Sequence, residues 1–351
     1  MRRPDILFLA NWSRTHRATG DYAFFTHWRS RPRVRFFGTF SLGAFTRWEK
    51  NRLRFYLLQP LLALLRAPFY DAVIAFSSQS GLPFAALLRL CFWMKTKLIV
   101  FDVESFGRAK SGMKLRLVRF GAKRIDHVIY AARAQATYYE DYLPFLRERS
   151  TFVPLGIGVP AQPPIGDAGR RGPLLALGKH GRAFRDWATL LRAYAALENA
   201  PPLQIVGRAD LPAAERENVA IPPGVELIDY LPLDRLRARI VQARAILLPL
   251  PEREQSLGQL SLLLSMALGK AVVASRIIGL TDYLRDGETG LFYIPGDAND
   301  LARALRELLA DPTRAIAMGR AARRAVEEQF NDERMGRRWE EIFFAVTNLP
   351  R

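Results

Sequence analysis

The chain has 351 residues, which is more than one hydrophobic core usually serves, so its length predicts two domains. Hydrophobic residues make up 49% and charged residues 25%, which excludes long disordered stretches, and the single cysteine excludes an intrachain disulfide framework. The net charge of +18 predicts a phosphate-rich partner, an anionic membrane or a nucleic acid, and does not choose between them.

The first half alternates short apolar runs with helical patterns, as parallel strands and crossover helices do. Strands are predicted at residues 6–10, 34–37, 72–76, 98–103, 127–131 and 151–154. Helices are predicted at residues 52–65, 83–93, 113–123 and 134–142. The run at 6–10 is too short for the core of a signal peptide. Residues 1–158 are therefore expected to form one Rossmann-like α/β domain with a doubly wound sheet.

Residues 47–58 interleave basic side chains with large apolar ones. This composition is typical of an amphipathic helix that lies on an anionic membrane. A core helix with a solvated basic side has the same composition, so both interpretations stay open. No stretch of the sequence reaches the roughly 18 to 20 apolar residues that span a bilayer. We therefore expect a cytoplasmic protein that binds peripherally to the inner face of the membrane.

Residues 159–172 are rich in glycine and proline and are predicted to be a linker. A second series of strands follows at residues 174–177, 203–206, 226–228, 245–250, 271–274 and 291–294. Its helices are predicted to begin near residues 186, 233, 261, 280 and 298, with two further helices at 314–330 and 332–346. Residues 173–330 are thus expected to form a second Rossmann-like domain, and residues 331–351 a separate C-terminal helix.

The polar loop at residues 256–261 lies between a predicted strand and a predicted helix. Unpaired N–H groups and the helix dipole favour phosphate at such a position. Every loop from a strand to a helix in an α/β fold shares some of this property, so the loop by itself is a weak indication of a phosphate site.

Three motifs make the indication stronger: Ser256-Leu-Gly-Gln259, Met266-Ala-Leu-Gly-Lys270 and Asp286-Gly-Glu-Thr-Gly290. Their order resembles the C-terminal domain of glycosyltransferases of the group 1, family 4 type, which have the GT-B fold. The resemblance covers the second half, while the first half is similar only in architecture. It implies two Rossmann-like domains that face each other across a cleft and a C-terminal helix that crosses back to the first domain.

The resemblance also implies a nucleotide-sugar donor that binds mainly to the second domain. Lys179, Arg182 and Arg185 lie in a stretch similar to the family's glycine-basic loop and would neutralise the donor diphosphate in place of a metal ion. Asp186 is expected to cap the following helix instead. The residues expected to contact the donor are Gly178, Lys179, Arg182, Arg185, Arg208, Tyr230, Glu254, Ser256, Leu257, Gly258, Gln259 and Ser261.

The sequence departs from the family where two glutamates, with seven residues between them, often hold the donor. Ser256 and Leu264 occupy the corresponding positions. Glu252 and Glu254 lie just upstream, but their spacing does not match. The family type implies retention at the anomeric carbon, and the missing carboxylates leave inversion open.

Two candidate catalytic carboxylates end the predicted strand 98–103, at the edge where open α/β sheets bind ligands. Asp102 or Glu104 could accept the proton of the acceptor hydroxyl as a general base, or could cap the next loop. The loop after the first strand lies at the same edge. There His16 is a third catalytic candidate or a solvated loop histidine, and Gly20 and Asp21 are expected to contact the acceptor.

These residues together predict a glycosyltransferase of the hexosyltransferase class that uses a nucleotide sugar, by default a UDP-sugar, without a metal or other cofactor. The acceptor is expected to be a saccharide or a lipid-linked saccharide, in exopolysaccharide or glycolipid synthesis. The alternatives are a GT-B scaffold that has lost activity, a sugar-nucleotide epimerase and, since the charge allows it, a nucleic-acid-binding protein. The chain has no zinc-finger spacing and no basic tail, so we expect no nucleic-acid partner.

Overall fold

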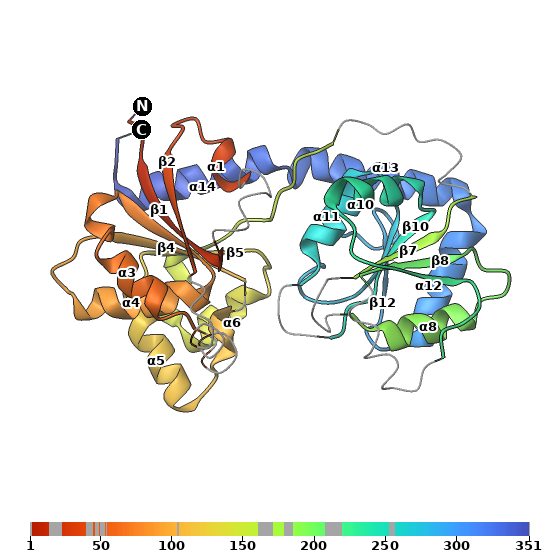
Figure 1. The fold of residues 1–351 in the computed structure, drawn as a ribbon, viewed down its shortest axis with the longest axis horizontal. Coiled ribbons are helices and arrows are strands. Elements are labelled where there is room, and N and C mark those ends of the chain that lie inside the picture. Colours follow the sequence, from red (N-terminus) through yellow and green to blue (C-terminus); the bar gives the residue numbers. More distant parts are fainter. Residues whose placement is uncertain are drawn as a thin grey trace. The chain divides into compact units, whose positions relative to one another are not determined.

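The computed structural model describes residues 2–13, 23–39, 45, 49, 53, 55–103, 105–160, 171–178, 185–207, 220–252 and 257–350. The chain forms two compact units (Figure 1). The first consists of Met1–Pro154 and Asp332–Arg351, and the second of Leu155–Asn331. Residues 155–158, which the sequence analysis places in the first domain, pack in the second unit, because the N–H of Leu155 donates to the Tyr283 hydroxyl (3.0 Å) and the N–H of Ile157 to the Phe330 carbonyl (2.9 Å).

The first unit contains a six-stranded sheet in the order β2-β1-β3-β4-β5-β6, and every neighbouring pair is parallel. The strands are β1 (Asp5–Ser13), β2 (Arg33–Thr39), β3 (Ala72–Phe76), β4 (Lys97–Asp102), β5 (His127–Tyr130) and β6 (Ser150–Phe152). Residues of the central strands are buried on both faces of the sheet, which explains why they are continuous apolar runs in the sequence.

Helices cover both faces of this sheet (Figure 1). One face packs against α3 (Leu58–Leu64), α4 (Ser78–Leu90) and α5 (Gly112–Ala122), and the other against α1 (Ala23–Thr26) and α14 (Asp332–Thr347). Other helical segments in the described part of the unit are η3 (Ala67–Phe69), η4 (Ser105–Arg108), α6 (Gln135–Tyr142) and η5 (Pro144–Arg149). The alternation of side chains along each strand divides the buried residues between these two layers.

The C-terminal helix α14 is held in the first unit by aromatic packing and by one buried carboxylate. The ring of Trp339 lies 4.8 Å from that of Phe24 and 5.2 Å from that of Phe101. Glu340 accepts hydrogen bonds from the N–H of Ser30 (2.8 Å), the hydroxyl of Ser30 (2.6 Å) and the N–H of Arg29 (3.0 Å). The last helix therefore completes the core of the unit in which the chain begins.

The second unit contains a six-stranded parallel sheet in the order β12-β11-β10-β7-β8-β9. Its strands are β7 (Leu174–Leu177), β8 (Leu203–Val206), β9 (Val225–Ile228), β10 (Ala245–Leu248), β11 (Val272–Ser275) and β12 (Leu291–Tyr293). Its helices are α8 (Trp187–Ala195), α10 (Leu233–Gln242), α11 (Gln259–Ala267), α12 (Ala298–Ala310) and α13 (Pro312–Gln329). Two apolar clusters, one on each face of the sheet, form its core. The predicted α/β class is confirmed.

Three predicted helices differ from the structure. The helix expected at 83–93 is α4, which begins five residues earlier, at Ser78, and ends at Leu90. The helix expected at 52–65 begins at Leu58, where the Glu49 carboxylate accepts the N–H groups of Leu57 (2.7 Å) and Leu58 (3.1 Å). The prediction of a helix that begins near Leu280 is wrong, because residues 278–283 form consecutive turns. Directly after these turns, the N–H of Arg285 donates to the Thr289 hydroxyl and not to a helix carbonyl.

Candidate functional site

The strand order of the second unit defines one crevice position for a ligand. The chain runs outward from β7 through β8 to β9, then returns to place β10 on the other side of β7. In open α/β sheets, ligands bind at the carboxyl ends of the strands where the order reverses in this way. That position lies between the carboxyl ends of β7 and β10, which are followed by Gly178 and by the loop that leads to Gly258.

A row of hydrogen bonds ties the strand ends together along this edge. The N–H of Gly178 donates to the Val206 carbonyl (2.7 Å), and the N–H of Asp186 to the Pro249 carbonyl (2.8 Å). The N–H of Leu250 donates to Ser275 Oγ (2.8 Å), whose partner is the Tyr293 hydroxyl (2.8 Å). These hydrogen bonds hold the carboxyl ends of the strands in fixed positions before a ligand binds.

Ser275 and Tyr293 were not among the predicted site residues. Each is the last residue of a buried strand, β11 and β12. A search for polar side chains at the carboxyl ends of the predicted strands would have found both.

Gly178 allows two strand ends to approach more closely than any other residue would. A Cβ atom at this position would lie 2.4 Å from the Val206 carbonyl oxygen. Since a backbone atom cannot swing away as a side chain can, only glycine fits here without a shift of β8. The glycine predicted from the family resemblance is therefore explained by the close approach of β7 and β8.

Gly258 is the N-cap of α11 and has the left-handed backbone conformation, with φ +86°. A Cβ atom there would lie 2.5 Å from Leu250 Cδ1. Among the described residues no side chain caps this helix end. The first-turn N–H groups and the helix dipole thus favour an anion beside the switch point.

The other described residues that were predicted to contact the donor differ in how far they are buried. Gln259 is buried in the first turn of α11, and Ser261 is half-buried in the same turn. Leu257 packs partly against the core of the unit. Tyr230 follows β9 at the same edge of the sheet and is 66% exposed.

Arg185 and Asp186 differ in their roles. Arg185 is buried, and its Nε donates to the Leu177 carbonyl at the end of β7 (2.5 Å). The Asp186 carboxylate accepts the N–H of Thr189 (3.1 Å) and caps α8, so this prediction is confirmed. The guanidinium of Arg185 is therefore anchored beside the switch point by one of its nitrogens.

Several predicted site residues lie outside the described part of the chain. These are His16, Gly20, Asp21, Glu104, Lys179, Arg182, Arg208, Glu254 and Ser256.

Asp102, the described candidate for a general base, is fully buried in the first unit. Its Oδ2 accepts hydrogen bonds from the N–H of Phe106 (3.0 Å) and the hydroxyl of Tyr139 (2.9 Å). Burial and the neighbouring Asp102 raise the pKa of the Tyr139 hydroxyl, which therefore stays protonated and donates. These contacts favour the alternative role, in which Asp102 shapes the loop after β4.

Leu264, the described one of the two positions where the family often has glutamates, and Lys270 of the second motif both have structural contacts. Leu264 is buried in α11 and packs in the apolar core. Lys270, in the second motif, donates from Nζ to the Ala243 carbonyl (2.9 Å), and burial lowers its pKa to about 8. Both residues therefore stabilise the packing of the unit.

The third motif builds a turn that positions β12. Asp286 accepts the N–H of Phe292 (2.8 Å), and the Thr289 hydroxyl accepts the N–H of Arg285 (2.8 Å). A Cβ atom on Gly290 would lie 2.6 Å from the Val272 carbonyl oxygen. This motif thus fixes the end of the sheet rather than a ligand contact.

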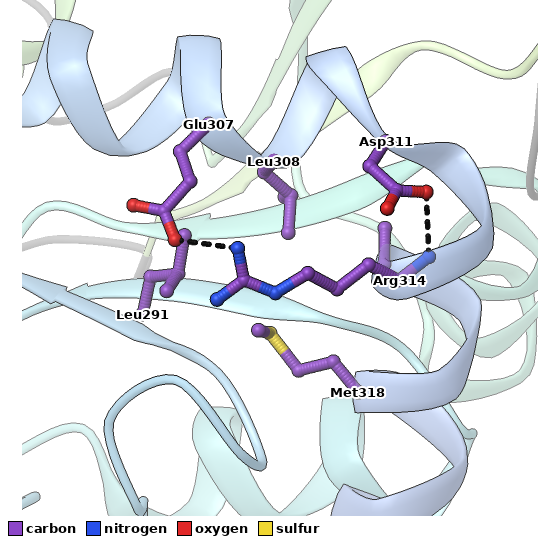
Figure 2. Close-up of a pocket in the computed structure, with 7 residues that line it drawn as sticks. Leu291, Glu307, Leu308, Asp311, Arg314 and Met318 are labelled. Carbon is purple, nitrogen blue, oxygen red and sulfur yellow. Dashed lines mark hydrogen bonds and ion pairs between the residues drawn. The ribbon is translucent and has the colours of Figure 1, made fainter.

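A shallow depression on the second unit is lined by residues of β12, α12 and α13. Arg314 crosses it to pair with Glu307 (2.9 Å), as Figure 2 shows. Leu291, which also lines it, is the first residue of β12, so the depression is at the amino end of the sheet. A substrate site is therefore not expected there.

Among the described residues, no group of three or more histidine, cysteine, aspartate or glutamate side chains could hold a metal ion. No helix in the described part of the chain is both long and apolar enough to cross a membrane.

The fold of the whole chain is similar to that of solved GT-B glycosyltransferases. The structure of HepE from Anabaena in complex with UDP-glucose has a TM-score of 0.71 at 17% sequence identity, and the match covers 99% of this chain and 100% of that one. The chain therefore has the GT-B fold, as the motifs imply.

Residues 174–311 of the second unit match the model of a family described as glycosyl transferases group 1. The alpha-maltose-1-phosphate synthase of Mycolicibacterium smegmatis is 32% identical over 185 residues, 48% of this chain and 47% of that protein. The N-acetyl-alpha-D-glucosaminyl L-malate synthase of Bacillus anthracis is 33% identical over 109 residues, 31% of this chain and 28% of that protein. The chain matches less than half the length of each of these relatives.

Proposed function

We propose that the protein transfers a sugar from a nucleotide-diphosphate sugar, by first choice a UDP-sugar, to a hydroxyl of a saccharide or lipid-linked acceptor. The observation that carries the proposal is the pair Gly178 and Gly258, which follow neighbouring strands at the switch point of the group 1 unit. The choice of UDP is supported by the likeness in fold to HepE, whose structure contains UDP-glucose.

In the proposed reaction the donor diphosphate binds at the N-terminus of α11 and is neutralised by Lys179, Arg182 and Arg185. The bond from the anomeric carbon to the diphosphate oxygen breaks, and a bond to the acceptor oxygen forms. The hydroxyl proton passes to a carboxylate or to the departing diphosphate. Basic side chains and helix amides would stabilise the leaving group without a metal ion. Retention follows the family type.

The proposed setting is the cytoplasmic face of a membrane, in exopolysaccharide or glycolipid synthesis. The net charge of +18 supports it, since anionic lipid headgroups attract basic proteins. A lipid-linked acceptor would be encountered at that surface.

A thermal-shift panel of uridine, guanosine and adenosine diphosphates and their sugar conjugates tests donor binding. The variant Lys179→Gln/Arg182→Gln should weaken the stabilisation, whereas Arg192→Gln/Arg306→Gln, with the same change of charge on exposed helix positions, should not. Failure of every nucleotide to raise the melting temperature would overturn the donor assignment. Metal independence is tested by measuring sugar transfer from the active donor in the presence of excess chelator. Loss of transfer would show that the reaction needs a metal ion.

A second candidate function is that of a GT-B scaffold without activity, and the buried Leu264 favours it, because an apolar core position replaces a donor contact. Mass spectrometry of the donor and acceptor after incubation separates the two functions. Donor binding without any glycosylated product supports the scaffold, and a glycosylated acceptor supports the transferase.

A further inference from the structure

Large apolar side chains are concentrated on one part of the first unit. Of the seventeen large hydrophobic side chains that are exposed in the described residues, ten lie between Leu57 and Phe120. They come from α3, η3, the end of α4 and α5, and α3 packs on α4 as α4 packs on α5. A soluble protein seldom exposes such a cluster unless it binds a partner or a membrane.

Helix α5 has two apolar faces. Leu115, Val118 and Ala122 pack into the core of the unit. Met113, Leu117 and Phe120 are spaced i, i+4 and i+7, so they form a stripe on the opposite side of the helix. Met113 is 66% and Leu117 is 62% exposed. The buried face explains how α5 packs in the unit. The exposed apolar stripe does not contribute to that packing, so its composition needs another explanation.

The end of α4 extends this stripe. Phe92 and Trp93 follow the helix, are 83% and 67% exposed, and have their rings 5.4 Å apart. Arg89 connects the two helices, because its guanidinium lies 4.6 Å from the centre of the Phe120 ring and donates to the Phe120 carbonyl (2.9 Å). The residues Leu90, Phe92, Trp93, Met113, Leu117 and Phe120 are called here the α4–α5 surface.

The sequence around the α4–α5 surface is strongly basic. Residues 85–125 contain ten lysines and arginines and two acidic residues, Asp102 and Glu104. On α5, Lys114 flanks the apolar stripe on one side, and Arg116 and Lys123 flank it on the other, all three exposed. Apolar and aromatic tips bordered by cations match the boundary between acyl chains and anionic headgroups.

We propose that the α4–α5 surface is the membrane-binding surface of the protein and that its partner is a bilayer containing anionic lipid. The charge complementarity selects this occupant: a nucleic acid would use the cations but gain little from the exposed leucine, methionine and phenylalanine side chains. The inference rests on the membrane part of the proposed function and assigns it to α4 and α5, rather than to residues 47–58.

Vesicle flotation of the full chain tests this assignment. The protein should float with vesicles of phosphatidylcholine and phosphatidylglycerol, float much less with phosphatidylcholine alone, and bind less as salt is raised. The variants Phe92→Ser/Trp93→Ser and Met113→Gln/Leu117→Gln should each weaken partition into the anionic vesicles by roughly tenfold or more. The matched control Ile221→Ser/Leu233→Ser removes two exposed apolar side chains from the second unit and should bind as the unmodified protein does.

Three outcomes would overturn the proposal: no flotation of the unmodified protein at moderate salt, unchanged flotation of both surface variants, or an equal loss in the control. A change from dimer to monomer in the surface variants, measured by light scattering, would identify a second copy as the occupant instead. Donor binding is read separately by thermal shift. If the unmodified protein floats but no nucleotide sugar stabilises it, the donor assignment fails while the membrane surface stands.

Discussion

At the scale of single residues, the close approach of β7 and β8 at Gly178 leaves no room for a Cβ atom. Replacement by alanine forces Cβ against the Val206 carbonyl oxygen, and we expect Gly178→Ala to lower the free energy of unfolding by about 2 to 4 kcal/mol. Donor binding should weaken with it, since the end of β7, which borders the switch point, must shift away from β8. Urea denaturation of the full chain measures the first effect, and thermal shift the second.

Gly287→Ala is the matched control for this prediction. Gly287 has φ +76° with nothing within 4 Å of a Cβ atom, so only the backbone strain of about 1 kcal/mol is added. Equal losses for the two variants would contradict the explanation based on close approach.

Ser77 combines backbone strain with an unpaired buried group. It has φ +93° and ψ 152° before α4, a conformation that glycine adopts more easily, and its hydroxyl has no partner among the described residues. We expect Ser77→Gly to raise the free energy of unfolding by about 1 kcal/mol, because relief of strain exceeds the greater entropy of the unfolded chain. Ser77→Ala keeps the strain and should gain less. A loss of stability in Ser77→Gly would show that the hydroxyl has a role in the fold.

His127 predicts a pH dependence. Burial, then the charges of Arg338 and Arg149, lower its pKa from 6.5 to about 4. Between these two pH values the unfolded chain binds a proton that the folded chain does not, so stability is complete above pH 6.5 and falls as the pH drops toward 4. The difference amounts to about 3 kcal/mol at most. His127→Gln should therefore flatten the pH profile of denaturation in this window, and parallel profiles for the two proteins would contradict the assignment.

At the scale of elements, α14 is a structural part of the first unit. Trp339 is buried, with its ring against Phe24 and Phe101. Trp339→Ala should destabilise the first unit by about 3 to 5 kcal/mol, as expected for a large aromatic side chain removed from a core. Arg338→Ala, at an exposed neighbouring position, is the control. Near-UV circular dichroism and denaturation report the loss, and a change of less than 1 kcal/mol would contradict this role of α14.

The elements also show where sequence reasoning succeeds and where it ends. Buried parallel strands leave continuous apolar runs, so strands such as β3, β7 and β8 were located to the residue. The prediction of a helix near Leu280 is wrong because apolar spacing alone does not distinguish consecutive turns, as at 278–283, from a short helix. The family motif located Gly258, whereas nothing in the local sequence reveals that Glu340 pairs with Ser30, more than three hundred residues away.

The candidate site was predicted only in part for a similar reason. Glycines at strand ends are conspicuous in a sequence, and the structure explains both Gly178 and Gly258 by short Cβ distances. Whether a carboxylate such as Asp102 faces a substrate or a neighbouring N–H depends on the tertiary packing of Phe106 and Tyr139, which periodicity does not encode. Residue type therefore indicated the edge of the sheet, and packing determined the role of each side chain there.

At the scale of the whole molecule, each of the two units has its own sheet and its own buried core. Calorimetry of the full chain should therefore resolve two unfolding transitions. A nucleotide sugar at one hundred times its dissociation constant should stabilise the second unit by about 2.7 kcal/mol, which raises its transition by roughly 5 to 10 °C. Trp339→Ala should lower only the other transition. A single transition that responds to both the donor and Trp339→Ala would show that the two units unfold together. If two transitions are resolved and the donor raises the one that Trp339→Ala lowers, the donor site lies in the first unit.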